Sequence, residues 1–346
     1  MRILITDKHF PDDIDVEREA GGSAAEFQVF NDGAEVPDEA WAWAEALVTY
    51  RCTQLVTEKI ERLRNCRVVV RGGVGFDGLD LEAFGARGIA VCNVPDYGTT
   101  EVADHALALM LALRRGIVSY HDGLRADPRA NWSYEHQRCL ARLRGSRYGV
   151  VGLGRIGMAA ARRARAFDME VVFYDPYLPP GADLATGYLR AERIEELVES
   201  ADAISLHTPL SRETEKFIDA ALLTRMKPGA VLVNTSRGPV VDIDALYAAL
   251  RDGPIGGAAL DVLPSEPPED HPLIRAYAAR EDWLDGRLIL TPHAAFYSVP
   301  GQRDLRRKSI ETIRGYLAGE PPRNCVNAPA LGLNRQDPPA GGGKRQ

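Results

Sequence analysis

Three stretches carry the side chains in this sequence that could do chemistry, and each follows an apolar run that predicts a β-strand. They are residues 234–238, 261–267 and 291–295, which supply Arg237, Glu266 and His293 respectively. An arginine can bind and polarise a carbonyl, a histidine can donate a proton to a forming alkoxide, and a carboxylate can keep that histidine charged. Hydride transfer from a nicotinamide to a ketone requires these three roles.

Each of the three residues also has a structural interpretation. Arg237 could form an ion pair that only stabilises the fold, and Glu266 lies in a proline-containing loop where it could simply face solvent. A histidine that follows a proline, as His293 does, is often structural. His207 ends another predicted strand and His105 lies on a predicted buried helix, so spacing alone leaves both histidines open as alternatives.

The segment 148–157 predicts a dinucleotide-binding turn between a strand and a helix. Gly152, Gly154 and Gly157 follow its apolar run with the spacing G-x-G-x-x-G, and a helix is predicted over 158–167. The first glycine permits a tight turn, the second lets backbone N–H groups approach a pyrophosphate, and the third lets helix and strand pack closely. The helix N-terminus adds free N–H groups and a partial positive charge. Alone, such glycines often only pack a helix on a strand.

Asp175 ends the next predicted strand, which covers residues 169–174. A carboxylate at this place accepts hydrogen bonds from the ribose hydroxyls of a dinucleotide and repels a 2′-phosphate. The alternative is that Asp175 only caps the turn at Pro176. With the glycine motif upstream, the sequence predicts NAD rather than NADP as the cofactor.

Length and composition limit the class of protein. The chain has 346 residues, 45% of them hydrophobic and 26% charged, with a formal net charge of −7. This is typical of a globular protein of two domains and argues against binding to nucleic acid or a membrane surface. The five cysteines are far apart and form no C-x-x-C motif: Cys52, Cys66, Cys92, Cys139 and Cys325. We therefore expect reduced thiols, no metal site and a cytoplasmic location. The N-terminus has no signal-peptide pattern.

Strands that alternate with helices predict an α/β fold with two Rossmann-like or flavodoxin-like domains, each built on a parallel sheet. We expect the cofactor domain, residues 100–295, to be inserted into a discontinuous substrate-binding domain formed by residues 1–99 and 296–333. Residues 334–346 are rich in proline, glycine and charge, and are predicted to be disordered. The apolar helix predicted over 100–115 and the aromatic residues of segment 122–144 would suit a contact between subunits.

From Arg2 to about Ala330 the chain resembles the D-isomer-specific 2-hydroxyacid dehydrogenase family. The matching motifs occur in family order, at residues 71–77, 91–95, 101–106, 152–157, 234–238, 261–262 and 291–293. Four further segments are most similar to the C-terminal-binding-protein branch, which includes transcriptional corepressors of animals: residues 173–178, 265–267, 293–298 and 324–327. Two positions depart from the pattern, because Phe296 replaces a tryptophan of the corepressors and Gly78 replaces a common asparagine.

The resemblance implies roles for individual residues. It implies that Arg237, Glu266 and His293 are the catalytic set, and that Arg71, Arg237 and the backbone N–H groups near Val74 and Gly75 hold the substrate carboxylate. It places the following residues on the cofactor: Gly152, Gly154, Arg155, Ile156, Gly157, Asp175, Thr208, Thr235, Ser236, Arg237, Asp261 and His293. It also implies a homodimer built on the cofactor domain.

The sequence thus predicts an NAD-dependent D-2-hydroxyacid dehydrogenase, equally a 2-oxoacid reductase, acting on a small 2-oxo or 2-hydroxy acid. Two alternatives stay open. One is an NAD(H)-sensing interaction protein similar to the corepressors, with incidental turnover. The other is a dehydrogenase of a phosphonate or phosphite analogue of the acid, because the same cation and imidazole could serve it.

Overall fold

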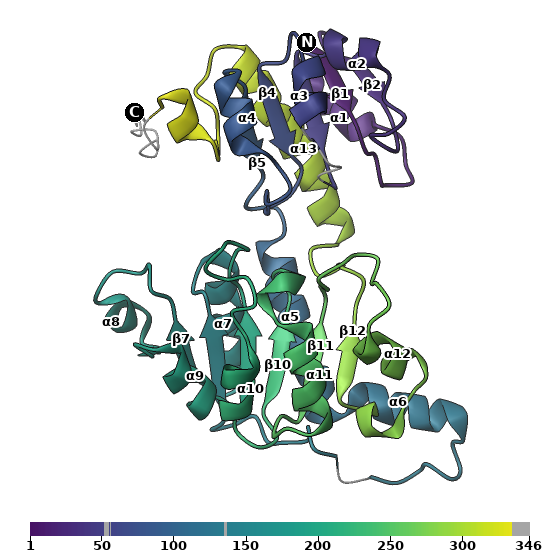
Figure 1. The fold of residues 1–346 in the computed structure, drawn as a ribbon, viewed down its shortest axis with the longest axis vertical. Coiled ribbons are helices and arrows are strands. Elements are labelled where there is room, and N and C mark those ends of the chain that lie inside the picture. The colour runs from purple at the N-terminus through teal and green to yellow at the C-terminus, as the bar shows by residue number, and fades with distance from the viewer. Residues whose placement is uncertain (52–54, 56, 135–136, 334–346) are drawn as a thin grey trace, which may run out of the picture. The chain divides into compact units, whose positions relative to one another are not determined.

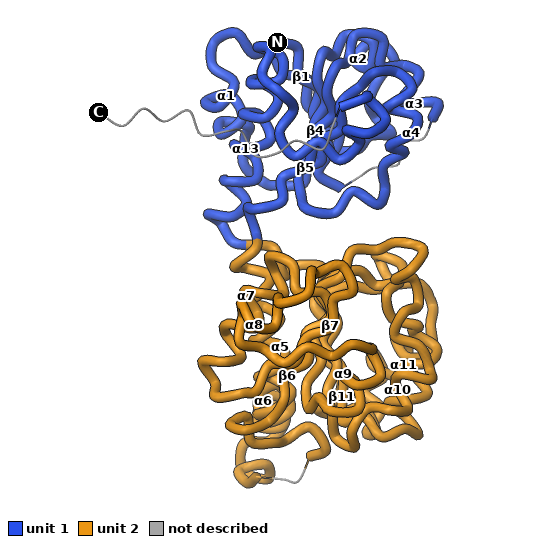
Figure 2. Tube along the Cα trace, turned by 90° about the vertical axis from the view of Figure 1, so that its left-hand side faces the viewer, with its two compact units in different colours: residues 1–98, 298–346 blue, residues 99–297 orange. Residues whose placement is uncertain are grey.

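A computed structural model describes residues 1–51, 55, 57–134 and 137–333 of the chain. The chain divides into two compact units, coloured separately in Figure 2: unit 1 comprises residues 1–98 and 298–346, and unit 2 comprises residues 99–297. Each unit contains one sheet whose paired strands all run parallel. The predicted α/β class with two parallel sheets is therefore confirmed. Cys52 and the predicted disordered tail, residues 334–346, lie outside the described residues.

Unit 1 is built on five strands in the order β2-β1-β3-β4-β5 (Figure 1). The strands are β1 (Arg2–Ile5), β2 (Glu26–Val29), β3 (Ala46–Thr49), β4 (Val68–Arg71) and β5 (Ala90–Asn93). The helices of the unit are α1 (Asp15–Gly21), α2 (Asp38–Trp43), α3 (Thr57–Arg62), α4 (Leu81–Ala86), α13 (Val299–Leu317) and the 3-10 turn η3 (Ala328–Leu331). The central strands are runs of buried aliphatic residues, as expected for a parallel sheet covered on both faces.

A buried ion pair attaches the C-terminal helix α13 to the N-terminal helix α1. Arg306 is 1% exposed and Glu17 is fully buried. The guanidinium donates twice to the carboxylate, from Nε to Oε1 at 2.8 Å and from Nη2 to Oε2 at 2.7 Å. Arg306 also pairs with Asp12 at 2.8 Å, so removal of Arg306 would leave the buried charge of Glu17 without its cation. The pair therefore stabilises the packing of α13 on α1.

Unit 2 is built on seven strands in the order β12-β11-β10-β9-β6-β7-β8. The strands are β6 (Arg147–Val151), β7 (Glu170–Tyr174), β8 (Leu189–Arg190), β9 (Ala203–Leu206), β10 (Val231–Asn234), β11 (Gly257–Leu260) and β12 (Leu288–Leu290). From β6 the chain first adds strands on one side, through β7, and then on the other, through β9. Open parallel sheets bind ligands at such a switch point, beyond the carboxyl ends of the strands.

Helices cover both faces of the seven-stranded sheet. One apolar layer includes residues of α5 (Thr99–Arg115) and α7 (Arg155–Ala166). The opposite layer includes residues of α9 (Ile194–Ser200), α10 (Ala220–Arg225), α11 (Ile243–Arg251) and α12 (Pro272–Ala278). The other described helices of unit 2 are α6 (Ile117–Ala126), α8 (Ala182–Thr186) and the 3-10 turns η1 (Gly238–Val240) and η2 (Asp282–Leu284).

The structure corrects the predicted elements at a few places. Helix α7 begins at Arg155 instead of at residue 158, because Gly154 acts as its N-cap. Helix α6 includes the first residues of the segment predicted as a polar arm, and neither β2 nor α2 was predicted. Within the part of the chain that the structure describes, no helix has the length and apolar character needed to cross a membrane.

Candidate active site

The glycine turn after β6 has the geometry that a pyrophosphate needs. Gly152 has a φ of 87°, a conformation that side chains rarely adopt. A Cβ on Gly157 would lie 2.1 Å from the carbonyl oxygen of Gly152, so turn and helix can approach this closely only with glycine. A Cβ on Gly154 would meet no atom within 4 Å, and Gly154 provides no side-chain cap for α7. The first N–H groups of α7 therefore face an open space suited to an anion.

These glycines allow a prediction with a built-in control. Gly157→Ala should destabilise the protein by roughly 1–3 kcal/mol, since the new methyl group cannot fit against the turn. Gly154→Ala should lower the stability of the cofactor-free protein by less, up to about 1 kcal/mol, because alanine is a poorer N-cap than glycine. It should still weaken NADH binding about tenfold or more, because the methyl group occupies the space of the phosphates. Thermal unfolding and NADH titration measure the two effects. Equal NADH affinity of wild type and Gly154→Ala would contradict this placement of the pyrophosphate.

Asp175 lies directly after β7, beside the glycine turn. Its Oδ2 accepts a hydrogen bond from the backbone N–H of Leu153 at 3.0 Å, and its Oδ1 accepts one from Tyr177 N–H, also at 3.0 Å. The carboxylate therefore does cap the turn that follows it, and it also fixes the glycine turn. Each carboxylate oxygen can accept a second hydrogen bond, so a ribose hydroxyl can be bound in addition.

Two threonines add an independent test of whether the residues fit a dinucleotide. Among the described residues, the hydroxyls of Thr208 and Thr235 are buried without a hydrogen-bond partner. Thr208 follows β9 at the switch point, and Thr235 follows β10. Thr208 lies beside the glycine turn, because a Cβ placed on Gly152 would be 3.1 Å from the methyl group of Thr208. Buried hydroxyls normally find partners, and a polar ligand at this edge would satisfy both. The residues present thus fit a dinucleotide.

Arg237 lies in the turn after β10, and the backbone around it is held on both sides. The side chain of Asn234 donates to the carbonyl oxygen of Arg237 at 2.9 Å and accepts from Ser236 N–H at 3.0 Å. Gly238, the next residue, packs directly against the backbone of Leu263. A Cβ placed on Gly238 would lie 1.9 Å from the carbonyl carbon of Leu263, so a side chain cannot fit there. This close packing brings the turn of Arg237 against the segment that carries Glu266.

Glu266 and His293 form a hydrogen-bonded pair. His293 Nδ1 lies 2.6 Å from Glu266 Oε2, and the other oxygen of Glu266 accepts from the backbone N–H of Leu263 at 3.0 Å. Burial favours the neutral carboxyl, but the hydrogen bond and positive charge of His293, with the charge of Arg237, outweigh it and lower the pKa of Glu266 below its ordinary 4.5. Glu266 therefore stays ionised at neutral pH, and its contribution to the pair is lost only as the pH falls through this lowered pKa.

Asp261 holds the loop that presents His293. Its buried carboxylate accepts hydrogen bonds from the Thr291 hydroxyl at 2.6 Å and from the backbone N–H groups of Ala294 and Ala295 at 2.9 Å each. Its carbonyl oxygen accepts from His293 N–H at 2.8 Å. His293 itself has a φ of 51°, which costs free energy for a residue with a side chain and is maintained by these contacts. The sequence had given Asp261 a role only near the cofactor.

The two competing histidines have other partners. His105 Nε2 lies 3.0 Å from the Thr291 hydroxyl, so His105 supports the same loop from α5; this supporting role of His105 and Thr291 was not predicted. His207 Nε2 lies 2.9 Å from the Ser205 hydroxyl. Burial lowers the pKa of His207 to about 4, so its imidazole is neutral at physiological pH.

The lowered pKa of His207 predicts acid sensitivity of the fold. His207 has a pKa of about 4 when folded and about 6.5 when unfolded, so between these values the unfolded chain binds the extra proton. Stability should therefore fall as the pH drops through this window, by roughly 1–3 kcal/mol from this residue. His207→Gln, which keeps an amide group near Ser205, should lose less stability over the same range in urea titrations. Identical pH dependence of the two proteins would contradict the lowered pKa of His207.

Of the predicted substrate-carboxylate residues, Arg237 lies in unit 2, whereas Arg71 ends β4 of unit 1 and Val74 and Gly75 follow it. Asn93 Nδ2 donates to the carbonyl oxygen of Val74 at 2.7 Å and so fixes the glycine loop that contains Gly75. The guanidinium of Arg71 folds back onto this loop, because its Nη1 donates a hydrogen bond to the carbonyl oxygen of Gly72 at 2.6 Å. If residue 73 had a side chain, its Cβ would lie only 1.3 Å from this Nη1 atom. A glycine at position 73 is thus required for Arg71 to take this place.

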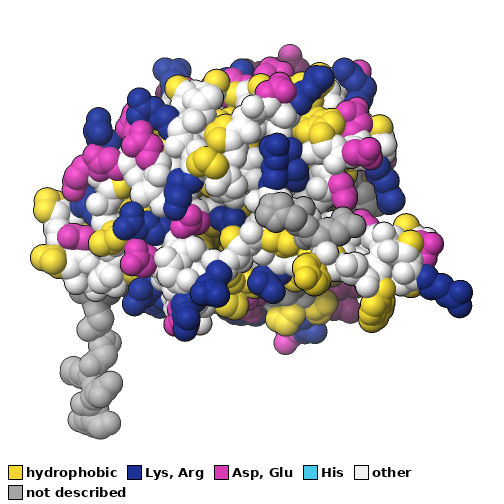
Figure 3. Space-filling view, turned by 90° about the horizontal axis from the view of Figure 1, so that it is seen from below, with side chains coloured by type: hydrophobic (Ala, Val, Ile, Leu, Met, Phe, Trp, Pro, Cys, Tyr) yellow, Lys and Arg dark blue, Asp and Glu magenta, His cyan; other side chains and the backbone are white. Residues whose placement is uncertain are grey.

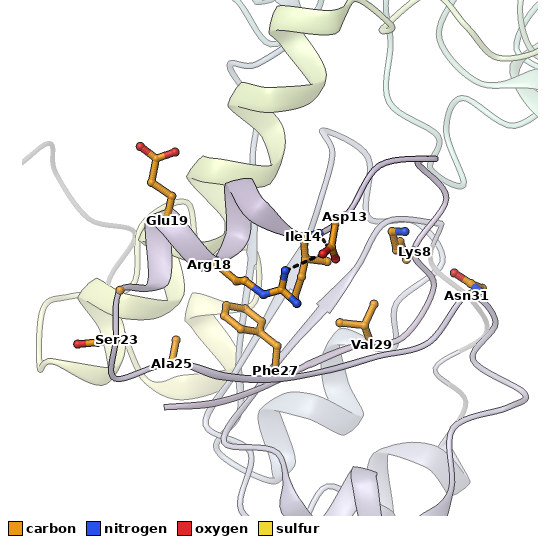
Figure 4. Close-up of a pocket in the computed structure, with 11 residues that line it drawn as sticks. Lys8, Asp13, Ile14, Arg18, Glu19, Ser23, Ala25, Phe27, Val29 and Asn31 are labelled. Atoms are coloured by element: carbon orange, nitrogen blue, oxygen red, sulfur yellow. Dashed lines mark hydrogen bonds and ion pairs between the residues drawn. The ribbon is translucent and has the colours of Figure 1, made fainter.

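A separate hollow of about 860 Å³ opens in unit 1 between α1 and the edge strand β2 (Figure 4). Arg18 crosses its wall and forms an ion pair with Asp13 at 2.8 Å. Its lining includes none of the residues predicted to bind substrate or cofactor. This hollow is therefore separate from the predicted active site.

Charge is dispersed on the face of the molecule drawn in Figure 3, where basic and acidic side chains are interspersed. Within the described ranges, no group of three or more His, Cys, Asp or Glu side chains is arranged to hold a metal ion. The prediction that the protein binds no nucleic acid stays a prediction.

Residues 107–295 match the model of the D-isomer specific 2-hydroxyacid dehydrogenase NAD binding domain. The chain belongs to the D-isomer-specific 2-hydroxyacid dehydrogenase family. This confirms the family resemblance and supports NAD as the cofactor, while the assignment to the C-terminal-binding-protein branch stays a prediction.

The curated relatives of the chain include D-3-phosphoglycerate dehydrogenases. The chain is 37% identical over 288 residues to D-3-phosphoglycerate dehydrogenase of Methanocaldococcus jannaschii, which covers 83% of this chain and 52% of the relative. It therefore spans about half the length of the curated relatives it matches.

Two solved structures match nearly the whole chain. D-lactate dehydrogenase of Aquifex aeolicus, complexed with NAD and lactic acid, has 26% identity and a TM-score of 0.79, with 92% of this chain and 96% of that chain covered. The NADPH-dependent glyoxylate/hydroxypyruvate reductase of Sinorhizobium meliloti, complexed with NADP and malonate, has 28% identity and a TM-score of 0.81, with 97% and 99% covered.

Proposed function

We propose that this protein is an NAD-dependent D-2-hydroxyacid dehydrogenase that interconverts a small 2-oxo acid and its D-2-hydroxy acid. The observation that carries the proposal is the 2.6 Å hydrogen bond between His293 Nδ1 and Glu266 Oε2, formed on a loop that follows β12 at the ligand-binding edge of a dinucleotide-binding sheet. A histidine fixed through Nδ1 by an ionised carboxylate keeps Nε2 available for proton transfer.

The chain's own residues supply binding and proton transfer. NAD(H), when bound by the glycine turn, Asp175, Thr208 and the residues after β10, would exchange hydride with C2 of the substrate. Arg237 would bind the substrate carboxylate and polarise the carbonyl oxygen, and Arg71 with the N–H groups of Val74 and Gly75 would hold the same carboxylate. In the reductive direction His293 would donate a proton from Nε2 to the forming alkoxide, and Glu266 would stabilise the positive charge that His293 carries beforehand.

The proposal assigns residues 100–295 to cofactor binding and residues 1–99 with 296–333 to substrate binding. Support for the first assignment comes from the family match over 107–295. The cytoplasmic location predicted from the cysteines stays a prediction.

The deciding experiment is NADH oxidation by the purified protein with a panel of 2-oxo acids: glyoxylate, pyruvate, hydroxypyruvate, phenylpyruvate and methylthio-oxobutyrate. A parallel assay follows the reduction of NAD+ with phosphite, because phosphite can only donate hydride and is oxidised to phosphate. We expect rapid turnover of one acid, and unchanged turnover in His207→Gln at neutral pH, because that histidine stands outside the acid–base pair. Tight NADH binding without turnover of any acid would favour the NAD(H)-sensing alternative. Reduction of NAD+ with phosphite, without turnover of any 2-oxo acid, would favour the phosphite alternative.

We also propose a homodimer formed by unit 2. Large apolar side chains are exposed in and after α6, where Ile117 is 56%, Trp132 78% and Tyr134 91% exposed. Large exposed apolar side chains often mark a contact between subunits, so we infer that a second copy of the chain covers them. Light scattering after size-exclusion chromatography should give twice the chain mass, and Trp132→Ser should shift the equilibrium toward monomer. A wild-type mass of one chain at micromolar concentration would exclude this dimer.

A further inference from the structure

Two cysteines of unit 1 lie directly opposite each other on neighbouring extended segments. Cys92 lies in β5, which is an edge strand of the five-stranded sheet, and Cys325 lies shortly before η3. The two residues form an antiparallel bridge. Two backbone hydrogen bonds flank it, from Val326 N–H to Val91 O at 2.8 Å and from Asn93 N–H to Asn324 O at 3.3 Å.

This hydrogen-bond pattern makes Cys92 and Cys325 a non-hydrogen-bonded pair, in which facing Cα atoms of antiparallel strands are closest, at about 4.5 Å. A disulfide spans Cα separations of roughly 4.4–6.8 Å. The side chain of Asn327 fixes the register, because it donates to Ile89 O at 2.9 Å and accepts from Val91 N–H at 2.8 Å. The backbone is therefore already placed for a disulfide, while both cysteines are free thiols in this structure.

The two thiols differ in a way that suits stepwise oxidation. Cys92 is fully buried, whereas Cys325 is half-buried and accessible to a small oxidant. The hydrogen bond with Cys92, followed by the backbone of Asn327 and of Val91, lowers the pKa of Cys325 to about 7. The hydrogen bond with Cys325 and burial raise the pKa of Cys92. Because the thiolate is the nucleophile, Cys325 is the residue that reacts first.

We propose that Cys92 and Cys325 are a redox-active dithiol that closes to a disulfide with hydrogen peroxide and so joins segment 324–331 covalently to β5. In the first step the Cys325 thiolate attacks one peroxide oxygen, the O–O bond breaks, and the departing hydroxide takes up a proton as water. Cys325 is then a sulfenic acid. In the second step the Cys92 sulfur attacks the Cys325 sulfur, the S–O bond breaks, and the hydroxide leaves as water with the Cys92 proton. The two thiols are oxidised by two electrons and one peroxide is reduced to two waters.

The cross-link would act on the edge of unit 1. It closes a covalent loop over most of the chain, which restricts the unfolded state, and it prevents the C-terminal segment from leaving the edge strand. Asn93, the neighbour of Cys92, holds the carbonyl of Val74, so the link also stiffens the support of the glycine loop. The inference stands on unit 1 alone and is independent of the proposed activity.

The test treats the full-length protein with hydrogen peroxide and maps its disulfides by non-reducing tryptic digestion and mass spectrometry. We expect the peptide of residues 88–114 joined to that of residues 324–335, lighter than their sum by two hydrogen atoms, and the link should disappear with dithiothreitol. Peroxide uptake that stops at sulfinic or sulfonic acid on Cys325, or a link to another cysteine, would overturn the proposal.

Three variants serve as controls. Cys66→Ala removes a buried cysteine outside the pair and should leave the link unchanged. Cys325→Ser replaces the half-buried member and should abolish the link without loss of fold. Cys92→Ala should leave Cys325 as a sulfenic acid that a dimedone probe captures. The rate of thiol alkylation against pH adds a readout that needs no oxidant: the apparent pKa of Cys325 should rise in Cys92→Ala. An unchanged alkylation profile would show that the two thiols do not interact.

Discussion

His293→Gln is expected to lower kcat for reduction of the preferred 2-oxo acid by roughly 10²–10⁴-fold, because the amide of glutamine is not acidic enough to transfer a proton to the forming alkoxide. NADH binding should change by much less, since the glycine turn and Asp175 lie on other segments of the sheet edge. Steady-state kinetics of NADH oxidation and a fluorescence titration of NADH measure the two effects. A variant that keeps more than a tenth of the wild-type kcat would remove His293 from the reaction.

Glu266→Gln is the matched partner of this variant. It keeps the shape and one oxygen of Glu266 but loses the charge that stabilises protonated His293, 2.6 Å away. We expect a smaller loss of kcat than in His293→Gln. Since Glu266 acts through His293, the double variant should be no slower than His293→Gln alone. A further loss of more than tenfold in the double variant would show that Glu266 touches the substrate by itself.

Asp261→Ala is expected to damage both folding and catalysis. It leaves the N–H groups of Ala294 and Ala295 without their acceptor in a buried site, which costs about 1–3 kcal/mol for each group. The loop would no longer hold His293 at its positive φ, so kcat should fall by about tenfold or more in the fraction that stays folded. Urea unfolding and kinetics on the purified folded protein give the two quantities.

Thr291→Val separates the parts of this effect. It removes only the hydroxyl that donates to Asp261 at 2.6 Å, while both backbone N–H groups keep their acceptor. Its loss of stability should be clearly smaller than that of Asp261→Ala, and kcat should change little. If both variants lost the same stability and the same kcat, the backbone contacts of Asp261 would not be what positions His293.

The local signals of the sequence were sufficient for the fold class and for most of the strands and longer helices. Runs such as residues 68–70 and 231–233 are aliphatic and fully buried, which is typical of strands buried on both faces. The glycines at 152, 154 and 157 act within one turn, and a turn depends mainly on its own residues. The strand β2 was missed because its four residues are exposed or only half-buried, so it carries no continuous apolar run.

The sequence by itself determined which residue types stand at the strand ends, and hence the candidates Arg237, Glu266 and His293. Only the tertiary structure decided that Glu266 pairs with His293 and that Cys92 faces Cys325. It also decided that His105 and Asp261 make hydrogen bonds to the loop that carries His293. These contacts join residues far apart in the chain, and they depend on which strands are neighbours and in what register. Register results from the packing of whole layers, which no single stretch of sequence contains.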